Sequence, residues 1–349
     1  MTKRPTMTDI ALAAGVSQAT VSLVLNEVPN ARVSADTRAR VKEVAQSLGY
    51  ARKSAPRLTE ARLIGMLIDD VSSTPFAAPF IEGARAEAAA QGVIVAVICT
   101  GADPAAEEAA LQTLQAAGAV GVLYISLVTR LVTPPAMLNQ MRAVLVNCHD
   151  RDHLLPCVTP GDVMGAFAAT LALVDAGHRR IAHLAGEPWT EAARDRLLGH
   201  RRALASQDIP FDPSLVSQPA WTVASGRTQM AALLDLPDPP TAVFCFNDRV
   251  AIGAYEALAA RGLSVPQDVS VVGFDNDDLS ALLQPPLTTV VLPHDEMARW
   301  AVARLLERAT PAPPVRVKID CDLIARNSVA APPCRSDLTK PDFPIEKPC

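Results

Sequence analysis

Residues 7–26 read MTDIALAAGVSQATVSLVLN. Thr6, just ahead of them, is a good helix N-cap, and Asp9 stands three residues later, where a capping box needs a polar acceptor. Gly15 can end this helix, because glycine adopts the left-handed C-cap conformation without a steric penalty. Two residues later Ser17 can cap another helix, so the segment predicts two short helices joined by a tight turn.

A third helix is expected in residues 33–50, which read VSADTRARVKEVAQSLGY. It should begin after the N-cap Ser34 and stop at Gly49. The inward faces of the three helices carry small and branched apolar side chains at helical spacing. These are Ile10, Ala11, Ala14, Val21, Val24, Leu25, Val41, Val44, Ala45 and Leu48. Caps, turn and spacing together predict an all-α helix-turn-helix head.

A head of this kind makes double-stranded DNA the first partner to consider, because the second helix of a helix-turn-helix enters the major groove. The charge distribution agrees. Residues 1–62 hold ten Lys and Arg against five Asp and Glu, a net charge of +5, although the whole chain of 349 residues has a net charge of −5. A basic head on an acidic body suits a tethered DNA reader. The alternative is a small helical bundle that binds another protein.

The composition predicts a reduced, cytoplasmic protein. Apolar residues make up 49% of the chain, enough for a large core. Seven cysteines in a chain of this size argue against a disulfide framework, since the number is odd. The first residues, MTKRP, are not followed by the apolar run of a signal peptide. No apolar run reaches the ~18 residues of a membrane span, so we expect no membrane partner.

After Arg62 strand-like and helical segments alternate. The first series places strands at residues 63–68, 93–99, 120–126 and 143–147, and helices at 81–90, 105–117 and 137–142. The second series places strands at 181–185, near 215, at 242–246 and at 269–273, and helices at 162–176, 191–206, 225–234 and 249–261. A late helix (295–308) and a late strand (315–321) are expected to cross back to the lobes. This alternation predicts two α/β lobes with doubly wound parallel sheets, whose ligand lies beyond the carboxyl ends of the strands.

The predicted organisation has four parts. The head is residues 1–50 and a hinge or linker is 51–62. An effector-binding and dimerisation domain spans 63–330, with one lobe at about 63–161 plus 291–320 and the other at 162–290 plus 321–330. The tail, 331–349, is Pro-rich and polar without helical periodicity, and we expect it to be disordered.

Four segments of the chain resemble the LacI/GalR family of bacterial repressors. They are the head, GHRRIAHLAG at 177–186, FNDRVAIGA at 246–254 and VPQDVSVVGFDN at 265–276. The resemblance covers roughly residues 6–328. It implies a helix-turn-helix head, a hinge helix and a two-lobed periplasmic-binding-protein-like core that forms a homodimer. It also implies a ligand-responsive transcription regulator, most often a repressor, with one head on each half-site of a near-palindromic operator.

The resemblance assigns DNA contacts to the head. Gln18 and Ala19 match the pair that reads the groove. The third specificity position is often Arg in the family and is Leu23 here, which removes a contact to guanine worth ~1–3 kcal/mol of discrimination. Positions that touch the DNA backbone or support the reading helix are matched by Thr8, Ser17, Thr20, Ser22, Asn26 and Val33.

The hinge departs from the family pattern. The family commonly has Pro-Asn and then Ala-Arg-Ser-Leu after Leu-Gly-Tyr, and that Leu opens a minor-groove step. Here residues 50–59 read YARKSAPRLT, about three residues shorter. Arg57 and Leu58 are candidates for the hinge contact, with Leu58 as the wedge. The alternative is a basic extended linker that contacts only phosphates, because Pro56 would break a helix from its middle.

The resemblance also maps an effector site between the lobes. The second lobe supplies Arg196, Trp221, Asn247 and Asp275, and the first supplies Asp69, Phe76 and Ser126. A guanidinium can hold two hydroxyls or a carboxylate, and an amide both donates and accepts. We therefore expect a sugar or sugar derivative, with purines, amino acids and other acids as alternatives. Taken singly, such residues are more often helix caps or core.

Residues 148–153 read CHDRDH, and with Cys157 they have the composition of a metal site. The spacing differs from paired Cys-x-x-Cys sites, so we expect no metal and no other cofactor. His149 or Asp150 touching the effector is the alternative. The sequence also lacks a nucleophile elbow and a phosphate-binding glycine loop, so we do not expect an enzyme. A solute-binding protein would fit the body alone but not the head.

Overall fold

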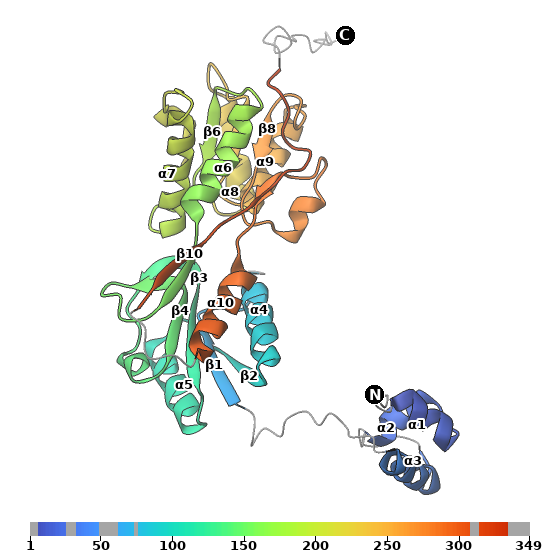
Figure 1. Cartoon of the computed structure of the whole chain (residues 1–349). Coiled ribbons are helices and arrows are strands. Elements are labelled where there is room, and N and C mark those ends of the chain that lie inside the picture. Colours follow the sequence, from blue (N-terminus) through green and yellow to red (C-terminus); the bar gives the residue numbers. More distant parts are fainter. Residues whose placement is uncertain (1–5, 26–32, 49–61, 73–75, 308–313, 334–349) are drawn as a thin grey trace, which may run out of the picture. The chain divides into compact units, whose positions relative to one another are not determined.

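A computed structural model of the chain describes residues 6–25, 33–48, 62–72, 76–307 and 314–333 (Figure 1). The chain divides into two units, residues 1–61 and residues 62–349. The expectations for Asn26, Arg57, Leu58 and the tail beyond residue 333 lie outside the described residues. Among the described residues, no helix is both long and apolar enough to cross a membrane.

The first unit contains the three predicted helices, α1 (Met7–Ala14), α2 (Gln18–Leu25) and α3 (Ala35–Ser47). The predicted capping box is confirmed, because Thr6 Oγ1 accepts from the backbone N–H of Asp9 and the Asp9 carboxylate accepts from the N–H of Thr6. Gly15 ends α1 with a φ of 64°. Ser34 caps α3 by accepting from the N–H of Thr37.

The core of the head is built from all three helices. Ile10 and Ala14 of α1, Val21 and Val24 of α2 and Val41 of α3 are buried. The core is small and aliphatic, so it depends on the helix spacing that places these side chains on facing surfaces. This arrangement confirms the helix-turn-helix prediction, although Leu48, expected on the inward face, is 40% exposed at the end of α3.

The second unit begins with a six-stranded, all-parallel sheet in the order β10-β5-β4-β3-β1-β2. The strands are β1 (Arg62–Ile68), β2 (Val93–Cys99), β3 (Gly121–Val132), β4 (Ala143–Asp150), β5 (Cys157–Pro160) and β10 (Arg316–Ile319). Helices cover both faces, which is why β1 and β4 read as nearly continuous apolar runs.

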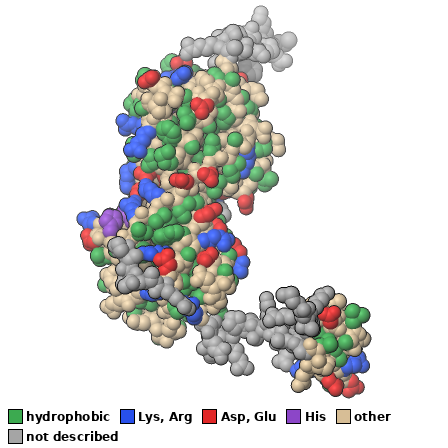
Figure 2. Space-filling view, in the orientation of Figure 1, with side chains coloured by type: hydrophobic (Ala, Val, Ile, Leu, Met, Phe, Trp, Pro, Cys, Tyr) green, Lys and Arg blue, Asp and Glu red, His purple; other side chains and the backbone are tan. Residues whose placement is uncertain are grey.

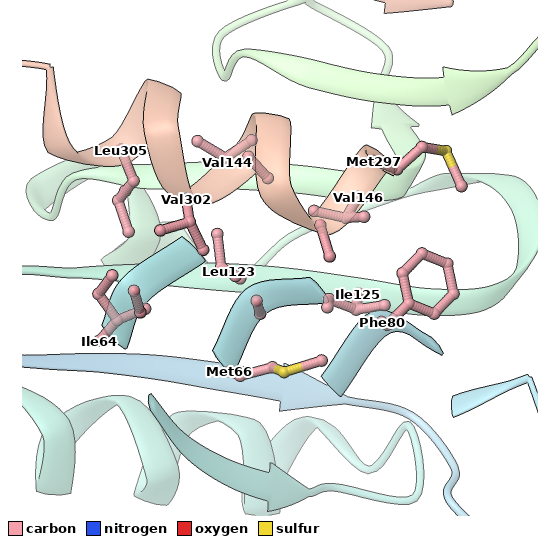
Figure 3. Close-up of a cluster of buried hydrophobic side chains, with 14 of the residues drawn as sticks. Ile64, Met66, Phe80, Leu123, Ile125, Val144, Val146, Met297, Val302 and Leu305 are labelled. Atoms are coloured by element: carbon pink, nitrogen blue, oxygen red, sulfur yellow. The ribbon is translucent and has the colours of Figure 1, made fainter. Parts of the chain in front are cut away.

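Each face of this sheet has its own core. One face is covered by α4 (Ala77–Ala90) and α10 (His294–Leu306), and the other by α5 (Pro104–Ala116) and the 3₁₀ helix η1 (Ala136–Gln140). Figure 3 shows the first core, in which Phe80 of α4 and Met297 of α10 lie against Ile125 of β3. Helix α10 follows the second lobe in sequence and yet belongs to the core of the first.

The second lobe has a three-stranded parallel sheet in the order β6-β7-β8, formed by β6 (Ile181–Leu184), β7 (Ala242–Cys245) and β8 (Ser270–Val272). Helices α6 (Asp162–Asp175) and α7 (Glu191–Ala205) contribute to the core on one face. Helices α8 (Val223–Leu234) and α9 (Asp248–Ala260) contribute to the core on the other. The two-lobed parallel α/β architecture confirms the predicted fold class (Figure 1).

Three segments join the lobes, and hydrogen bonds tie them together. The first, at Gly161, links β5 to α6; the second links β9 (Thr289–Val290) to α10; the third links β10 to β11 (Leu323–Ile324). Gly161 N donates to Ile319 O and Val291 N donates to Asp322 O, each at 2.8 Å. A Cβ atom on Gly161 would lie 3.1 Å from Ile319 O. Glycine therefore lets the first and third segments run in contact.

Several local predictions were wrong. The strand expected near Leu215 is a 3₁₀ helix, η2 (Pro213–Leu215), followed by a single bridge between Val216 and His183. Pro213 has no N–H, so the segment cannot form a full ladder. Strands β5, β9 and β11, of two to four residues each, were missed. Strand β3 runs to Val132 rather than residue 126, past an irregularity between Ile125 and Arg130.

Two glycines allow α8 and α9 to pack in close contact. A Cβ atom on Gly253 would lie 2.1 Å from Val223 O, and one on Gly226 would lie 2.4 Å from Val250 O. Gly253→Ala should therefore lower the free energy of unfolding by about 1–3 kcal/mol, as overpacking does. Urea unfolding followed by circular dichroism measures the change.

Helix propensity alone predicts the opposite sign, since Ala in a helix interior is favoured over Gly by ~1 kcal/mol. The matched control is Ala259→Leu, which adds bulk to an exposed position of the same helix. We expect that change to stay within about 0.5 kcal/mol. A Gly253→Ala protein as stable as the parent would contradict the close packing.

Candidate functional site

The head presents one candidate surface, at the start of α2. Ser17 caps this helix by accepting from the N–H of Thr20 at 3.1 Å, and the two hydroxyls lie 2.9 Å apart. Gln18 is exposed and Leu23 is 37% exposed, about one turn and a half apart on the helix. Thr8 of α1 is also exposed, whereas Ser22 is half-buried. Ala19 lies in α2, but its side chain is outside the described ones.

This surface offers chemistry suited to base edges. An exposed glutamine amide can pair with the N6 and N7 atoms of adenine, and an apolar side chain can contact the methyl group of thymine. The helix N-terminus adds backbone N–H groups that can bind a phosphate. Gln18 and Leu23 are thus the described side chains of α2 that can carry sequence information.

The body contains a second candidate site, built around the buried guanidinium of Arg196 on α7. Its Nε donates to Asp162 Oδ1 at 2.8 Å, and Nη1 donates to Phe246 O at 2.6 Å and to Asp275 Oδ1 at 3.3 Å. The guanidinium carbon lies 3.7 Å from the ring centre of Phe274 and 4.6 Å from that of Phe246. Two carboxylates and two rings therefore fix the position of one cation.

Electrostatics in this cluster are dominated by burial. Desolvation raises the pKa of Asp275 to about 7, with the charge of Arg196 opposing the shift. Burial likewise raises the pKa of Asp162, again against Arg196. Burial opposes the charge of Arg196, but the two carboxylates raise its pKa above the usual value, so the guanidinium stays protonated. One positive charge is shared by two acids.

The ends of the neighbouring strands supply the other second-lobe groups. Asn247 follows β7 and caps α9 by accepting from the N–H of Val250 at 2.8 Å, while its Nδ2 donates to Trp221 O at 3.3 Å. The Trp221 ring lies 5.2 Å from that of Phe246. Asp275 follows β8 with a φ of 109°, a strained value for a residue other than glycine.

The first lobe contributes a facing wall. Phe76 precedes α4, and its ring meets that of His294 edge-on at 5.9 Å. Thr129, in the irregular part of β3, donates to Asn147 Oδ1 at 2.7 Å, and Asn147 Nδ2 donates to Ser126 O at 2.9 Å. The irregularity in β3 thus turns Thr129 toward the end of β4.

These walls enclose an inner cavity of about 50 Å³. Its lining comprises Phe76, Leu127, Val128, Thr129, Asn147, Ala192, Arg196, Trp221, Phe246, Asn247, Asp275, Leu292 and His294. A larger outer cavity of about 550 Å³ shares Phe76, Asp275, Leu292 and His294 with it. The two cavities adjoin at the junction of the lobes, where residues that follow β7 and β8 lie near residues of β3 and β4.

The structure brings five of the expected effector residues to this space: Phe76, Arg196, Trp221, Asn247 and Asp275. Asp69 and Ser126 line neither cavity. Asp69 instead accepts from Ser126 Oγ at 2.9 Å, from Leu127 N and from Arg130 Nη2 at 3.0 Å. Both residues therefore hold the irregular segment of β3 behind the wall.

Sequence reasoning missed three polar or aromatic residues of the lining: Thr129, Asn147 and His294. Asn147 ends an apolar run, so the rule of inspecting residues after strands would have found it. Thr129 depends on the irregularity of β3, and His294 depends on α10 crossing to the first lobe. No local signal in the sequence marks either event.

The cysteine- and histidine-containing loop contributes to neither cavity. His149 Nε2 lies 2.6 Å from Glu191 Oε2, and Asp150 Oδ2 accepts from the N–H of Leu154. Burial raises the pKa of the Cys148 thiol well above its usual range. In the described part of the chain, no group of three or more His, Cys, Asp and Glu residues is placed to hold a metal ion.

Comparison with known proteins gives two family matches. Residues 6–53 match the family described as "Bacterial regulatory proteins, lacI family", and residues 170–329 match the "Periplasmic binding protein-like domain". The HTH-type transcriptional repressor CytR of Escherichia coli (strain K12) is 34% identical over 336 residues, which cover 94% of this chain and 97% of CytR.

Two solved structures are similar to this chain over more than nine-tenths of its length. The complex of the transcriptional regulator CelR with cellobiose has a TM-score of 0.64 and 30% identity, covering 93% of this chain and all of that one. The Lac repressor dimer bound to operator and the anti-inducer ONPF has a TM-score of 0.64 and 27% identity, covering 94% and 100%. The head and both lobes thus have counterparts within single chains.

Arg196→Met should be strongly destabilising, because it leaves Asp162 and Asp275 buried without their cation. The expected loss is about 3–5 kcal/mol in the free energy of unfolding. The loss should shrink on acidification. Because Arg196 lowers the pKa of Asp275 in the parent, its removal raises that pKa further, so protonation on acidification stabilises the folded variant more than the folded parent.

Urea unfolding at about pH 8 and about pH 5.5 tests both statements, since the raised pKa of Asp275, about 7, lies between them. Arg194→Met is the matched control, because Arg194 is exposed on the same helix and bonds only to carbonyl oxygens of residues 188 and 189. Equal losses in the two variants would contradict the buried-cation assignment.

Proposed function

As the chain belongs to the lacI family of bacterial regulatory proteins, we propose that it is a repressor whose operator affinity is altered by a small molecule bound between its lobes. The observation that carries the proposal is that one chain combines a helix-turn-helix head with a cavity lined from both lobes of the body. The head is the DNA-binding part, and the body makes that binding conditional.

The protein is proposed to bind DNA as a homodimer, with one head on each half-site of a near-palindromic operator. The solved Lac repressor is a dimer bound to operator, and this chain matches it over 94% of its length. Gln18, Ala19 and Leu23 would face the bases. Thr8, Ser17, Thr20 and Ser22 would position the helix on the backbone, as would Asn26, and Arg57 and Leu58 would belong to the hinge contact.

The effector is proposed to act by changing how the lobes close. Polar side chains already link them: Glu191 of α7 contacts His149 of β4 at 2.6 Å and pairs with Arg316 of β10 at 3.0 Å, and Asp195 pairs with Lys318 at 3.2 Å. A ligand that contacts both walls binds the closed form better than the open one. The free energy available to shift the heads equals that difference in affinity.

A sugar or sugar derivative is the effector class proposed. Arg196, Asn247, Asp275 and Asn147 offer donors and acceptors for hydroxyl groups. Trp221 and Phe76 supply aromatic faces for the apolar side of a ring. CelR, at 30% identity, was solved with cellobiose. Asp69 and Ser126 would act from behind the wall, by holding the segment that presents Thr129.

We propose that the protein binds its effector without converting it. A repressor of this kind acts on DNA, so we also propose that the protein acts in the cytoplasm. The test is retention of the full-length protein on operator DNA and its release, or tighter retention, on adding a compound found by a thermal-shift screen. The compound should be recovered unchanged. Consumption of it at a catalytic rate would favour an enzyme instead.

Gln18→Ala should change which operator sequences are preferred. A lost bidentate contact to a base costs ~1–3 kcal/mol of discrimination, or about five- to 150-fold at that base pair. Selection from a randomised operator pool, followed by sequencing, measures the preference. Gln46→Ala, at an exposed glutamine of α3, is the control. A folded Gln18→Ala protein with the parent preference would show that the groove assignment is wrong.

Asp275→Ala should raise the effector concentration needed for half-maximal response by about tenfold or more, since a charged hydrogen bond to the ligand is lost. Fluorescence anisotropy of labelled operator, titrated with effector, gives the value. Operator affinity without effector, measured alongside, identifies a folding failure. Asp152→Ala, at an exposed site that lines neither cavity, is the control. An unchanged response would exclude the cavity as the effector site.

A further inference from the structure

We infer that the effector carries a protonated amino group, in the simplest case an amino sugar, whose ammonium lies in the acidic outer cavity. The inference rests on the proposed function, because it specifies the ligand of the same site. It concerns the charge of that ligand, which neither the family match nor the relatives assign.

The sizes of the two cavities place most of the ligand in the outer one. The inner cavity, against Arg196 and Trp221, has a volume of only about 50 Å³, whereas the outer has about 550 Å³. The inner cavity is thus the smaller of the two. A ligand that contacts Arg196 and fills the larger cavity as well extends past the shared residues Phe76, Asp275 and His294.

The outer cavity is lined by carboxylates without a lining cation. Its acids are Glu82, Asp275, Asp277, Asp278, Asp295 and Glu296, and no Lys or Arg is among its described lining residues. Arg85, Arg299 and Arg249 pair with Glu82, Asp295 and Asp277 from outside. Asp278 and Glu296 have no ion pair among the described residues. Figure 2 shows acidic side chains at the level where the lobes meet.

The inner wall does not offset this charge. Arg196 is shared by Asp162 and Asp275, at 2.8 and 3.3 Å, so its single positive charge is already engaged by two carboxyl groups of the protein. The other oxygen of Asp275, Oδ2, has no hydrogen-bond partner in the described part of the chain, although the side chain is only 6% exposed. An anionic ligand would be repelled from the outer cavity, and a cation would be attracted to it.

His294 is a second, independent feature of this space. The residue is 3% exposed and lines both cavities, yet its ring nitrogens have no hydrogen-bond partner among the described residues. Stacking on Phe80, with ring centres 4.2 Å apart, fixes the ring. Burial lowers the pKa of His294 to about 3, so the ring is neutral and one nitrogen accepts. An ammonium donor is a complementary partner.

The test uses full-length protein and matched sugars that differ at one group. The panel holds D-glucosamine, D-galactosamine and D-mannosamine, each with its N-acetyl and hydroxyl counterpart, together with D-glucose 6-phosphate as an anion. Thermal shift and the tryptophan fluorescence report binding at about pH 6.5, where the amines are protonated. We expect an amine to bind at least about tenfold tighter than its neutral counterparts, and more weakly as salt rises.

Charge neutralisation in the outer cavity supplies the second arm. Glu296→Gln and Asp278→Asn should each weaken binding of that amine by about three- to tenfold, and should not weaken binding of a neutral sugar. Glu108→Gln, at an exposed acid of α5 outside both cavities, should leave the affinity unchanged. Unaltered amine affinity in both cavity variants would overturn the proposal, even if an amine binds.

The outcomes separate this inference from the proposed function. If a neutral or phosphorylated sugar binds as tightly as the amines and shifts operator binding, the proposed repressor function stands. The inference that the effector carries an ammonium is then wrong. That inference is also wrong if none of the amino sugars binds. If an amine binds with the expected variant pattern but operator binding does not respond, the charge preference stands and the proposed effector mechanism fails.

Discussion

The buried guanidinium of Arg196 is the interaction on which the arrangement of the second lobe depends. It ties together the start of α6 through Asp162, the end of β7 through Phe246 O and the end of β8 through Asp275. These three points otherwise diverge, because each belongs to a different element. A cation held by two acids and two rings satisfies its own charge within the protein and still faces the cavity. The ligand therefore meets a wall that is already assembled.

Most of the fold could be predicted because its rules are local. Thr6, Gly15 and Ser34 mark helix ends through chemistry that needs only a few neighbouring residues. The parallel strands follow from apolar runs of a length that helices rarely have. The failures lie where a segment is short or depends on a distant partner, as η2 at Pro213–Leu215 and β9 at Thr289–Val290 do. A two-residue strand such as β9 exists only because a neighbouring chain segment supplies its hydrogen bonds.

The candidate site was more accessible from the sequence on one wall than on the other. In the second lobe the lining residues Asn247 and Asp275 directly follow regular strands, so their positions follow from the alternation of elements. In the first lobe Thr129 lies past an irregularity in β3 and His294 arrives on a helix from the far end of the chain. Both placements require tertiary structure. The charge of the outer cavity likewise emerges only when α4, α10 and the segment after β8 are brought together.

The three bonded crossings between the lobes have a mechanical consequence. Because Gly161 is tied to Ile319 and Val291 to Asp322, the crossings form a narrow ribbon rather than three independent tethers. Three connected segments of this kind can bend and twist together, but they resist stretching and sideways sliding of one lobe relative to the other. The lobes are thus restricted to a small family of rotations about one axis. A small rotation about that axis, set by how a ligand fills the space beside it, becomes a displacement that grows with distance from the axis.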